Sequence, residues 1–216
     1  MEKTIIAPSI LSADFSKMGA EIERMQNSGA DWIHCDVMDG IFVPNITFGP
    51  KMIKDIRKVT NLMLDVHLMI TEPIRYIPQF AAAGADYITI HVEATDKVSE
   101  TLALIKEHGC KCGVVINPET DVEEVRRYIK ECDIVLIMSV HPGFGGQKFI
   151  PSAIEKLNKV RQMRDQLNSE CIIEIDGGIT SENVMQAKAA GAEAIVAGSA
   201  IFGSANPQKT IEEMRK

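Results

Sequence analysis

A chain of 216 residues, 45% hydrophobic and 25% charged, is long enough to bury a full core and has the composition of an ordinary soluble globular protein. Its net charge of −7 and its lack of any Lys/Arg cluster argue against binding to nucleic acid or to an anionic membrane. No run of about 18 or more apolar residues is present and the first residues lack the parts of a signal peptide, so we expect a cytoplasmic protein.

Apolar, strand-like runs alternate with helix-like segments along the whole chain, and no linker rich in Pro or Ser divides them. The runs are rich in Val, Ile and Leu on both faces, as is typical of parallel strands covered by helices. We therefore predict a single α/β domain over residues 1–216. The predicted strands are residues 5–9, 32–37, 62–69, 87–92, 112–116, 134–139, 172–176 and 194–197.

Helix signals lie between these strands. Four hydroxyl residues stand before acidic residues in the pattern of a capped helix start, at Thr71, Thr120, Ser152 and Thr180. Each is expected to begin one of the helices that cover the sheet.

Three glycines, each followed by Ala and an acidic residue, mark predicted helix ends at Gly29, Gly84 and Gly191. Their separations of 55 and 107 residues are close to two and four units of about 27 residues, and eight such units would fill the chain. Eightfold β-α alternation predicts a (β/α)8 TIM barrel, with a doubly wound open sheet as the alternative. The dinucleotide-binding form of that alternative is disfavoured, because no Gly-x-Gly-x-x-Gly follows the first strand.

Polar side chains gather at the predicted C-terminal ends of the strands, where barrels of this kind carry their chemistry. His34 and Asp36 share one face of the second strand because side chains alternate along a strand. His67 lies near the end of the third strand and Asp176 ends the seventh. Two imidazoles and two carboxylates form a ligand set for one divalent metal ion, with Zn, Fe(II), Mn and Co all compatible. The alternative, hydrogen-bonded core histidines, stays open at this point.

Other chemically active residues near the strand ends receive no clear role from the sequence. His91 and Glu93 end the fourth strand, and Glu174 is a core carboxylate or a support for the site. Cys35 alternates with the candidate ligands of its strand, so it should face the outer helices. The five cysteines are scattered and odd in number, which favours reduced, buried thiols over disulfides.

Two glycine-rich segments after the last strands predict an anion site. Gly177 and Gly178 follow the seventh strand, and Gly198 and Ser199 follow the eighth, where a short helix over 199–202 is expected. Loops at these positions of a barrel bind phosphate through backbone N–H groups, which suits an acidic protein with few basic residues to spare.

The segment 141–147, His-Pro-Gly-Phe-Gly-Gly-Gln, follows the sixth strand. Its glycine content predicts a mobile cover that closes on a ligand, with a simple turn as the alternative. Met38, Met69 and Met138 lie near strand ends and are candidates for an apolar wall, although single methionines more often fill a core.

Six segments carry a specific pattern when they are taken together in chain order. They are Ile-Ala-Pro-Ser-Ile-Leu-Ser-Ala-Asp-Phe (6–15), His-Cys-Asp-Val-Met-Asp-Gly-Ile-Phe-Val-Pro-Asn (34–45), Asp-Val-His-Leu-Met (65–69), Val-His-Pro-Gly-Phe-Gly-Gly-Gln-Lys-Phe (140–149), Asp-Gly-Gly (176–178) and Ala-Gly-Ser-Ala-Ile-Phe (197–202). The chain thereby resembles the ribulose-phosphate 3-epimerase family over essentially its whole length, with no departure at a position that the family needs.

The resemblance implies an isomerase that interconverts D-ribulose 5-phosphate and D-xylulose 5-phosphate through a cis-enediolate in the pentose phosphate pathway, and a homo-oligomer. It implies a divalent metal ion held by His34, Asp36, His67 and Asp176, with Asp36 and Asp176 also serving as the acid/base pair. It implies contacts with the sugar phosphate from Ser9, His67, Gly143, Phe144, Gly145, Gly146, Asp176, Gly177, Gly178, Gly198 and Ser199.

Two other functions stay open. An allulose-6-phosphate 3-epimerase would use the same chemistry on a longer sugar, and a catalytically silent sugar-phosphate-binding barrel would be expected to lack one of the paired carboxylates. Decarboxylases on similar barrels fit less well. They carry an Asp-x-Lys-x-x-Asp arrangement at the second strand, whereas the sequence Asp36-Val-Met-Asp39 contains no lysine.

Overall fold

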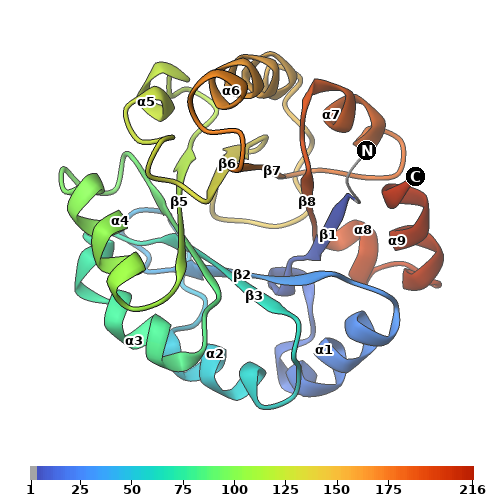
Figure 1. Cartoon of the computed structure of the whole chain (residues 1–216). Helices are drawn as coiled ribbons and strands as arrows, with labels where there is room; N and C mark the ends of the chain where they lie inside the picture. Colours follow the sequence, from blue (N-terminus) through green and yellow to red (C-terminus); the bar gives the residue numbers. More distant parts are fainter. Residues whose placement is uncertain (1–3) are drawn as a thin grey trace.

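The computed structural model describes residues 4–216, so the first three residues of the predicted 1–216 domain lie outside the described part of the chain. Parallel strands form one eight-stranded sheet in the order β1-β8-β7-β6-β5-β4-β3-β2. A parallel bridge between Ser9 and His34 links the end of β1 to β2, so the ring is nearly closed. Figure 1 shows the helices as an outer ring around this barrel. The strands are β1 (Ile5–Pro8), β2 (Trp32–Met38), β3 (Met63–Met69), β4 (Tyr87–His91), β5 (Lys111–Ile116), β6 (Ile134–Met138), β7 (Ile172–Asp176) and β8 (Ala194–Ala197).

The predicted (β/α)8 barrel is therefore confirmed, and the doubly wound alternative is excluded because the sheet curls back on itself. The predicted bounds of β7 and β8 match, and each of the other strands differs by one residue at one of its two ends. These strands are easy to locate in the sequence because each forms a continuous apolar run. One face of the strand packs against the helices and the other faces the barrel interior, so both faces are buried.

Helices and short 3-10 turns connect the strands on the outside of the barrel. Gly84 ends α3 with φ of 103° and Gly191 ends α7 with φ of 116°, as the sequence predicts for helix ends. The helices are α1 (Met18–Asn27), α2 (Pro50–Arg57), α3 (Ile77–Ala83), α4 (Val98–Glu107), α5 (Glu123–Arg126), α6 (Ala153–Leu167), α7 (Val184–Ala190), α8 (Ser199–Phe202) and α9 (Pro207–Arg215), with 3-10 turns η1 (Ile10–Ser12), η2 (Phe15–Lys17) and η3 (Pro73–Arg75).

The predicted helix starts are less accurate than the predicted ends. Ser152 stands at the N-cap of α6 without a side-chain capping bond, and the other three residues stand outside the cap position. The hydroxyl of Thr180 accepts a hydrogen bond from the N–H of Glu182 within a loop, whereas the hydroxyl of Thr120 donates to Glu93 on the neighbouring loop. Long-range or loop partners for these hydroxyls replace the local capping bond that the pattern suggests.

Side chains of each strand divide between the helix-facing core and the barrel interior. On β2, Ile33, Cys35 and Val37 pack into the large core beneath the helices, so Cys35 faces away from the interior as predicted. All five cysteines are buried and free, as predicted.

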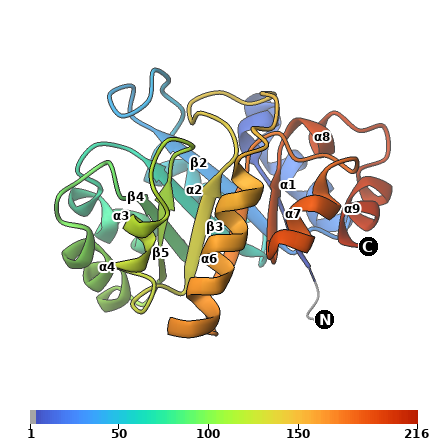
Figure 2. The same ribbon diagram turned by 90° about the horizontal axis from the view of Figure 1, so that it is seen from above.

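An apolar layer fills the interior at the end where the strands begin. Trp32 stacks on Tyr87 with ring centroids 4.6 Å apart. The layer consists of Ala7, Trp32, Ile134, Ala194 and Val196, packed by Ile5, Tyr87 and Ile172. Figure 2 shows long loops of residues 39–49 and 140–151 at the other end, where the strands finish and where a barrel of this kind carries its site. Within residues 4–216, no helix is long and apolar enough to cross a membrane.

Candidate active site

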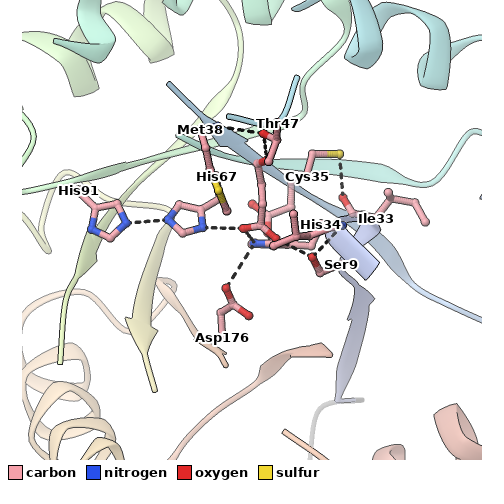
Figure 3. Close-up of polar contacts among 12 residues, drawn as sticks. Ser9, Ile33, His34, Cys35, Met38, Thr47, His67, His91 and Asp176 are labelled. Atoms are coloured by element: carbon pink, nitrogen blue, oxygen red, sulfur yellow. Dashed lines mark hydrogen bonds and ion pairs between the residues drawn. The ribbon is translucent and has the colours of Figure 1, made fainter. Parts of the chain in front are cut away.

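Four side chains from three strands converge at the C-terminal end of the barrel. His34 and Asp36 come from β2, His67 from β3 and Asp176 from the end of β7. The Asp36 Oδ1 atom lies 3.2 Å from His34 Nε2 and 3.1 Å from His67 Nδ1. His34 Nε2 also lies 3.9 Å from Asp176 Oδ2. Figure 3 shows the side chains of His34, His67 and Asp176 around one point.

The strand register explains this convergence. Asp36 and His67 are direct partners across the β2–β3 pair, so they stand side by side on the interior face. Asp176 reaches the same point from β7 because the ring brings the ends of the strands together.

The four residues fit a divalent transition metal ion. One nitrogen or oxygen atom from each lies within 4.8 Å of the other three. Two imidazoles and two carboxylates are a donor set that Zn²⁺, Fe²⁺, Mn²⁺ and Co²⁺ accept. In addition, the second ring nitrogen of each histidine already has a protein partner, which is the usual support for a metal-binding imidazole.

His34 is oriented by Asp65. Its Nδ1 atom lies 2.5 Å from Asp65 Oδ2, and both side chains are fully buried. Burial lowers the pKa of His34, but the charges of Asp36 and Asp65 outweigh burial and raise this pKa well above its ordinary value. The imidazole is therefore a cation without metal, and a metal ion that binds Nε2 must release that proton.

Glu174 lies behind this pair in the interior. His34, Asp65 and Glu174 form a second convergent set, but Asp65 already occupies the His34 Nδ1 atom. Both carboxyl oxygens of Glu174 lack a hydrogen-bond partner among the described residues. Burial and the charge of Asp65 raise the pKa of Glu174 well above its ordinary value, so this side chain is a neutral acid. Glu174 thus lies buried beneath the site as a neutral acid, and both roles that the sequence leaves open for it stay open.

Asp36 is held as a carboxylate. Burial raises its pKa, but the charge of His34 and hydrogen bonds from His34 and His67 lower it well below the usual range. The hydroxyl of Ser9 donates a hydrogen bond of 2.5 Å to Asp36 Oδ2. Ser9 therefore fixes the orientation of the Asp36 carboxylate through Oδ2, while the other oxygen, Oδ1, faces His67.

Asp176 has the opposite electrostatic setting. Its side chain keeps 16% of its surface exposed, and burial together with the charge of Asp36 raises its pKa to about 7. Near neutral pH the site therefore contains one ionised aspartate and one that readily holds a proton.

His67 leads outward to a second polar pair. Its Nε2 atom lies 2.8 Å from His91 Nε2, and His91 Nδ1 lies 3.2 Å from Glu93 Oε2. Burial lowers the pKa of both histidines, that of His67 to about 4. Sequence reasoning left His91 without a role, although His91 and Glu93 have the same two-residue spacing as His34 and Asp36.

A cavity opens above the four residues. Asp36 and Asp176 lie on its wall, together with Met38, Met69 and Met138, which fits the apolar wall considered from the sequence. All of the predicted substrate contacts except His67 line this cavity. They are Ser9, Gly143, Phe144, Gly145, Gly146, Asp176, Gly177, Gly178, Gly198 and Ser199.

The glycines beside Asp176 allow close backbone approach. Gly177 and Gly178 have φ of 123° and 64°, and a Cβ atom on Gly178 would lie 2.5 Å from the backbone N of Phe149. Helix α8 begins at Ser199, as predicted. Ser12 and Thr180 also line the cavity, and sequence reasoning missed both because a hydroxyl in a loop has no distinctive pattern.

The loop after β6 forms part of the cavity rim. Gln147 Nε2 donates hydrogen bonds to the backbone carbonyls of His141 and Phe144, and Asn45 Nδ2 donates to Gly143 at 2.8 Å. Phe144 is 54% exposed. These bonds tie the loop to itself and to the loop after β2, whereas its predicted mobility stays a prediction.

Comparisons with known proteins agree on one family. The sequence model of the "Ribulose-phosphate 3 epimerase family" matches residues 5–202. A ribulose-phosphate 3-epimerase of Bacillus subtilis (strain 168) is 51% identical over 211 residues, which cover 97% of each chain. One of Escherichia coli (strain K12) is 47% identical over 216 residues, which cover 100% of this chain and 96% of the relative.

Solved structures of lower identity share the fold. A 3-hexulose-6-phosphate synthase from Salmonella typhimurium superposes with a TM-score of 0.72 at 20% identity, covering 98% of this chain and 96% of that one. KGPDC from Streptococcus mutans gives a TM-score of 0.72 at 11% identity, covering 99% and 96%. At these identities the likeness is one of fold alone.

Proposed function

This chain belongs to the ribulose-phosphate 3-epimerase family, and we propose that it inverts C3 of a pentulose phosphate with Asp36 and Asp176 as its two proton-transfer groups. It is an enzyme, an epimerase of the pentose phosphate pathway. The proposed substrates are D-ribulose 5-phosphate and D-xylulose 5-phosphate, which differ only in configuration at C3.

The convergence of two aspartates with opposite pKa shifts carries the proposal. Inversion requires one proton to leave C3 from one face and another to arrive on the opposite face. Because one fixed base reaches only one face, two groups are needed. Asp36 from β2 and Asp176 from β7 line the same cavity. In the metal-free protein the pKa of Asp36 is lowered and that of Asp176 is raised, so the pair contains one ionised and one readily protonated carboxyl group.

In the proposed reaction the Asp36 carboxylate removes the C3 proton. The electron pair of the broken C–H bond forms a C2–C3 double bond, and the C2 oxygen becomes the oxyanion of a cis-enediolate. Asp176 then delivers its proton to the opposite face of C3, and the C2 carbonyl forms again. In the reverse direction the two aspartates exchange roles.

A divalent metal ion fits this reaction. His34, Asp36, His67 and Asp176 would hold it, and Asp65 would orient His34. Bound there, the ion supplies positive charge that stabilises the enediolate and keeps both aspartates able to ionise. The fit rests on the donor set and on the supported second nitrogens of both histidines.

The phosphate group is expected at the glycine-rich part of the cavity. Backbone N–H groups near Gly177, Gly178, Gly198 and Ser199 are the proposed donors, with the loop 143–146 closing over the sugar. Ser9 contributes by holding Asp36.

Solvent exchange tests the proposal directly. When the protein converts D-ribulose 5-phosphate in D2O, deuterium should enter C3 as D-xylulose 5-phosphate appears, because the proton delivered to C3 exchanges with water. A chelator should suppress both changes, and a divalent ion should restore them. Binding of the sugar phosphate without exchange would instead favour a catalytically silent barrel.

A further inference from the structure

The second ring nitrogen of His67 does not face a carboxylate, unlike that of His34. It faces another imidazole, since His67 Nε2 and His91 Nε2 are 2.8 Å apart. Both rings are fully buried and lie nearly parallel, with an interplanar angle of 27°. Figure 3 shows His91 on the side of His67 that faces away from His34 and Asp176.

A hydrogen bond between two nitrogens needs one proton between them. Two neutral imidazoles satisfy this in two ways, with the proton on His67 or on His91. If His67 carries it on Nε2, then the His67 Nδ1 atom has a free lone pair directed at the proposed metal site. If His91 carries it, a neutral His67 must hold its own proton on Nδ1, where it would point at Asp36 Oδ1, 3.1 Å away. Only the first arrangement can bind metal.

Glu93 selects between these arrangements. Its Oε2 atom lies 3.2 Å from His91 Nδ1, and a carboxylate can only accept. Glu93 therefore favours the form of His91 that carries its proton on Nδ1, which leaves the His91 Nε2 atom as an acceptor for His67. Without metal, the Asp36 carboxylate favours a proton on His67 Nδ1 for the same reason, so the two carboxylates compete. A metal ion bound at His67 Nδ1 would leave only the preference of Glu93.

The other oxygen of Glu93 is fixed independently. Its Oε1 atom accepts hydrogen bonds from the backbone N–H of Asn117, at 2.9 Å, and from the hydroxyl of Thr120. Lys156 of α6 donates in turn to the backbone carbonyls of Asn117 and Thr120. The loop after β5 thus holds Glu93 so that its second oxygen faces His91.

We propose that Glu93 and His91 are positioning residues that keep the Nδ1 lone pair of His67 free for a divalent metal ion. The inference rests on the proposed function, because it requires the metal site. Neither residue lines the cavity, and each is separated from the proposed metal ion by His67. They act by fixing where one proton lies on His67.

The variant Glu93→Gln reverses the selection with little change of shape. Its amide oxygen is expected to keep the Oε1 position, because Asn117 and Thr120 both donate there. The amide NH2 must then face His91 Nδ1 and donate to it. The proton of His91 moves to Nε2, and His67 is driven to hold its proton on Nδ1, where the metal should bind.

Zinc titration of the metal-free protein measures the result. We expect E93Q to bind Zn²⁺ about 10–100-fold more weakly than the wild type, as is usual when a supporting partner of a metal ligand is lost. E93D, which can still only accept, should bind more tightly than E93Q. The matched control is E119Q, which removes an exposed carboxylate paired with His141 on a neighbouring loop and should leave zinc affinity unchanged.

Nitrogen-15 NMR of the histidine rings gives a readout that a merely structural role would not move. In the Zn²⁺-loaded wild type, His91 should carry its proton on Nδ1. In E93Q it should carry the proton on Nε2. The spectrum of the Zn²⁺-loaded wild type decides the point if E93Q fails to fold, because a proton on Nε2 of His91 in that protein overturns the inference.

The outcomes separate this inference from the proposed function. A wild-type protein that does not bind Zn²⁺ removes the proposed metal site itself. A wild type that binds Zn²⁺, with an E93Q variant that folds and binds equally well, leaves the metal site standing and rejects the role of Glu93 and His91.

Discussion

The two ends of the barrel interior differ in every property that matters for stability and chemistry. At the end where the strands begin, the apolar layer packs Trp32 against Tyr87 and contains no ionisable group except that tyrosine. At the other end the strands place imidazoles and carboxylates within 4.8 Å of one another. The apolar layer gains free energy from burial, whereas the polar end buries charges at a cost. Substitutions at the apolar end are therefore expected to change mainly the stability of the protein, and substitutions at the polar end mainly its activity.

Between the two ends lies a layer that belongs to neither. Asp65, Thr89 and Glu174 are fully buried, and each has at least one polar atom without a hydrogen-bond partner among the described residues. Asp65 supports His34 from this layer, and the neutral Glu174 lies beside Asp65. The barrel interior thus changes from apolar to polar through an intermediate layer of buried polar side chains.

The largest expected effect is at the polar end. Replacing Asp176 by Asn should lower turnover by about 10²–10⁴-fold, because a group that transfers a proton is lost. Zinc affinity, measured on the same protein, should fall less, since an amide oxygen can still be a ligand. Near wild-type kcat in this variant would remove Asp176 from the mechanism.

The opposite end should give the opposite result. Replacing Trp32 by Ala should lower the free energy of unfolding by about 3–5 kcal/mol, because a large buried ring is removed. Urea unfolding measures this loss. Turnover per folded molecule should stay close to that of the wild type, and a large loss of kcat with unchanged stability would contradict the division between the ends.

The pH dependence of stability should also originate at the polar end. Asp176 has a pKa raised from 3.8 to about 7 in the folded, metal-free protein. Between these pH values the unfolded chain releases the proton while the folded chain keeps it, so this group makes the fold less stable as pH rises. Each unit corresponds to about 1.4 kcal/mol, so the loss is at most about 4 kcal/mol.

Urea unfolding of the metal-free wild type and D176N at pH 5 and pH 7 tests this sign. The wild type should lose stability relative to D176N between the two values. If the difference between the two proteins is the same at both pH values, the raised pKa of Asp176 is wrong.

The smallest effect concerns the orientation of the base. Ser9→Ala removes the hydroxyl that donates to Asp36 at 2.5 Å. A hydrogen bond to a charged group contributes about 1.5–3 kcal/mol, so kcat should fall about 10–100-fold. Steady-state kinetics with D-ribulose 5-phosphate measures the change, and Ser16→Ala on the exposed η2 turn is a suitable control. Equal kcat in S9A and S16A would show that Ser9 does not orient the base.

The sequence predicts most of the fold because the strands are apolar on both faces and the glycines that end α3 and α7 are distinctive. It also locates the four converging side chains, because alternation along β2 puts His34 and Asp36 on one face. It fails for Thr120, whose hydroxyl bonds Glu93, 27 positions away, instead of a helix start. No local pattern reports such a partner.

The link from His67 to Glu93 was missed for a related reason. The spacing of His91 and Glu93 shows that they share a face, but not that His91 faces an imidazole of the neighbouring strand. That contact depends on the curvature of the barrel and on the side-chain rotamers. Its consequence, the proton position on His67, is visible only once the distances are known.

The central claim is that Asp36 and Asp176 each serve one face of C3, and solvent exchange by the two single variants tests it most directly. Zinc-loaded D36N and D176N are incubated in D2O with each epimer separately. Each variant should exchange the C3 proton of one epimer without inverting it, and the two variants should act on opposite epimers. Exchange of both epimers by either variant would contradict the claim.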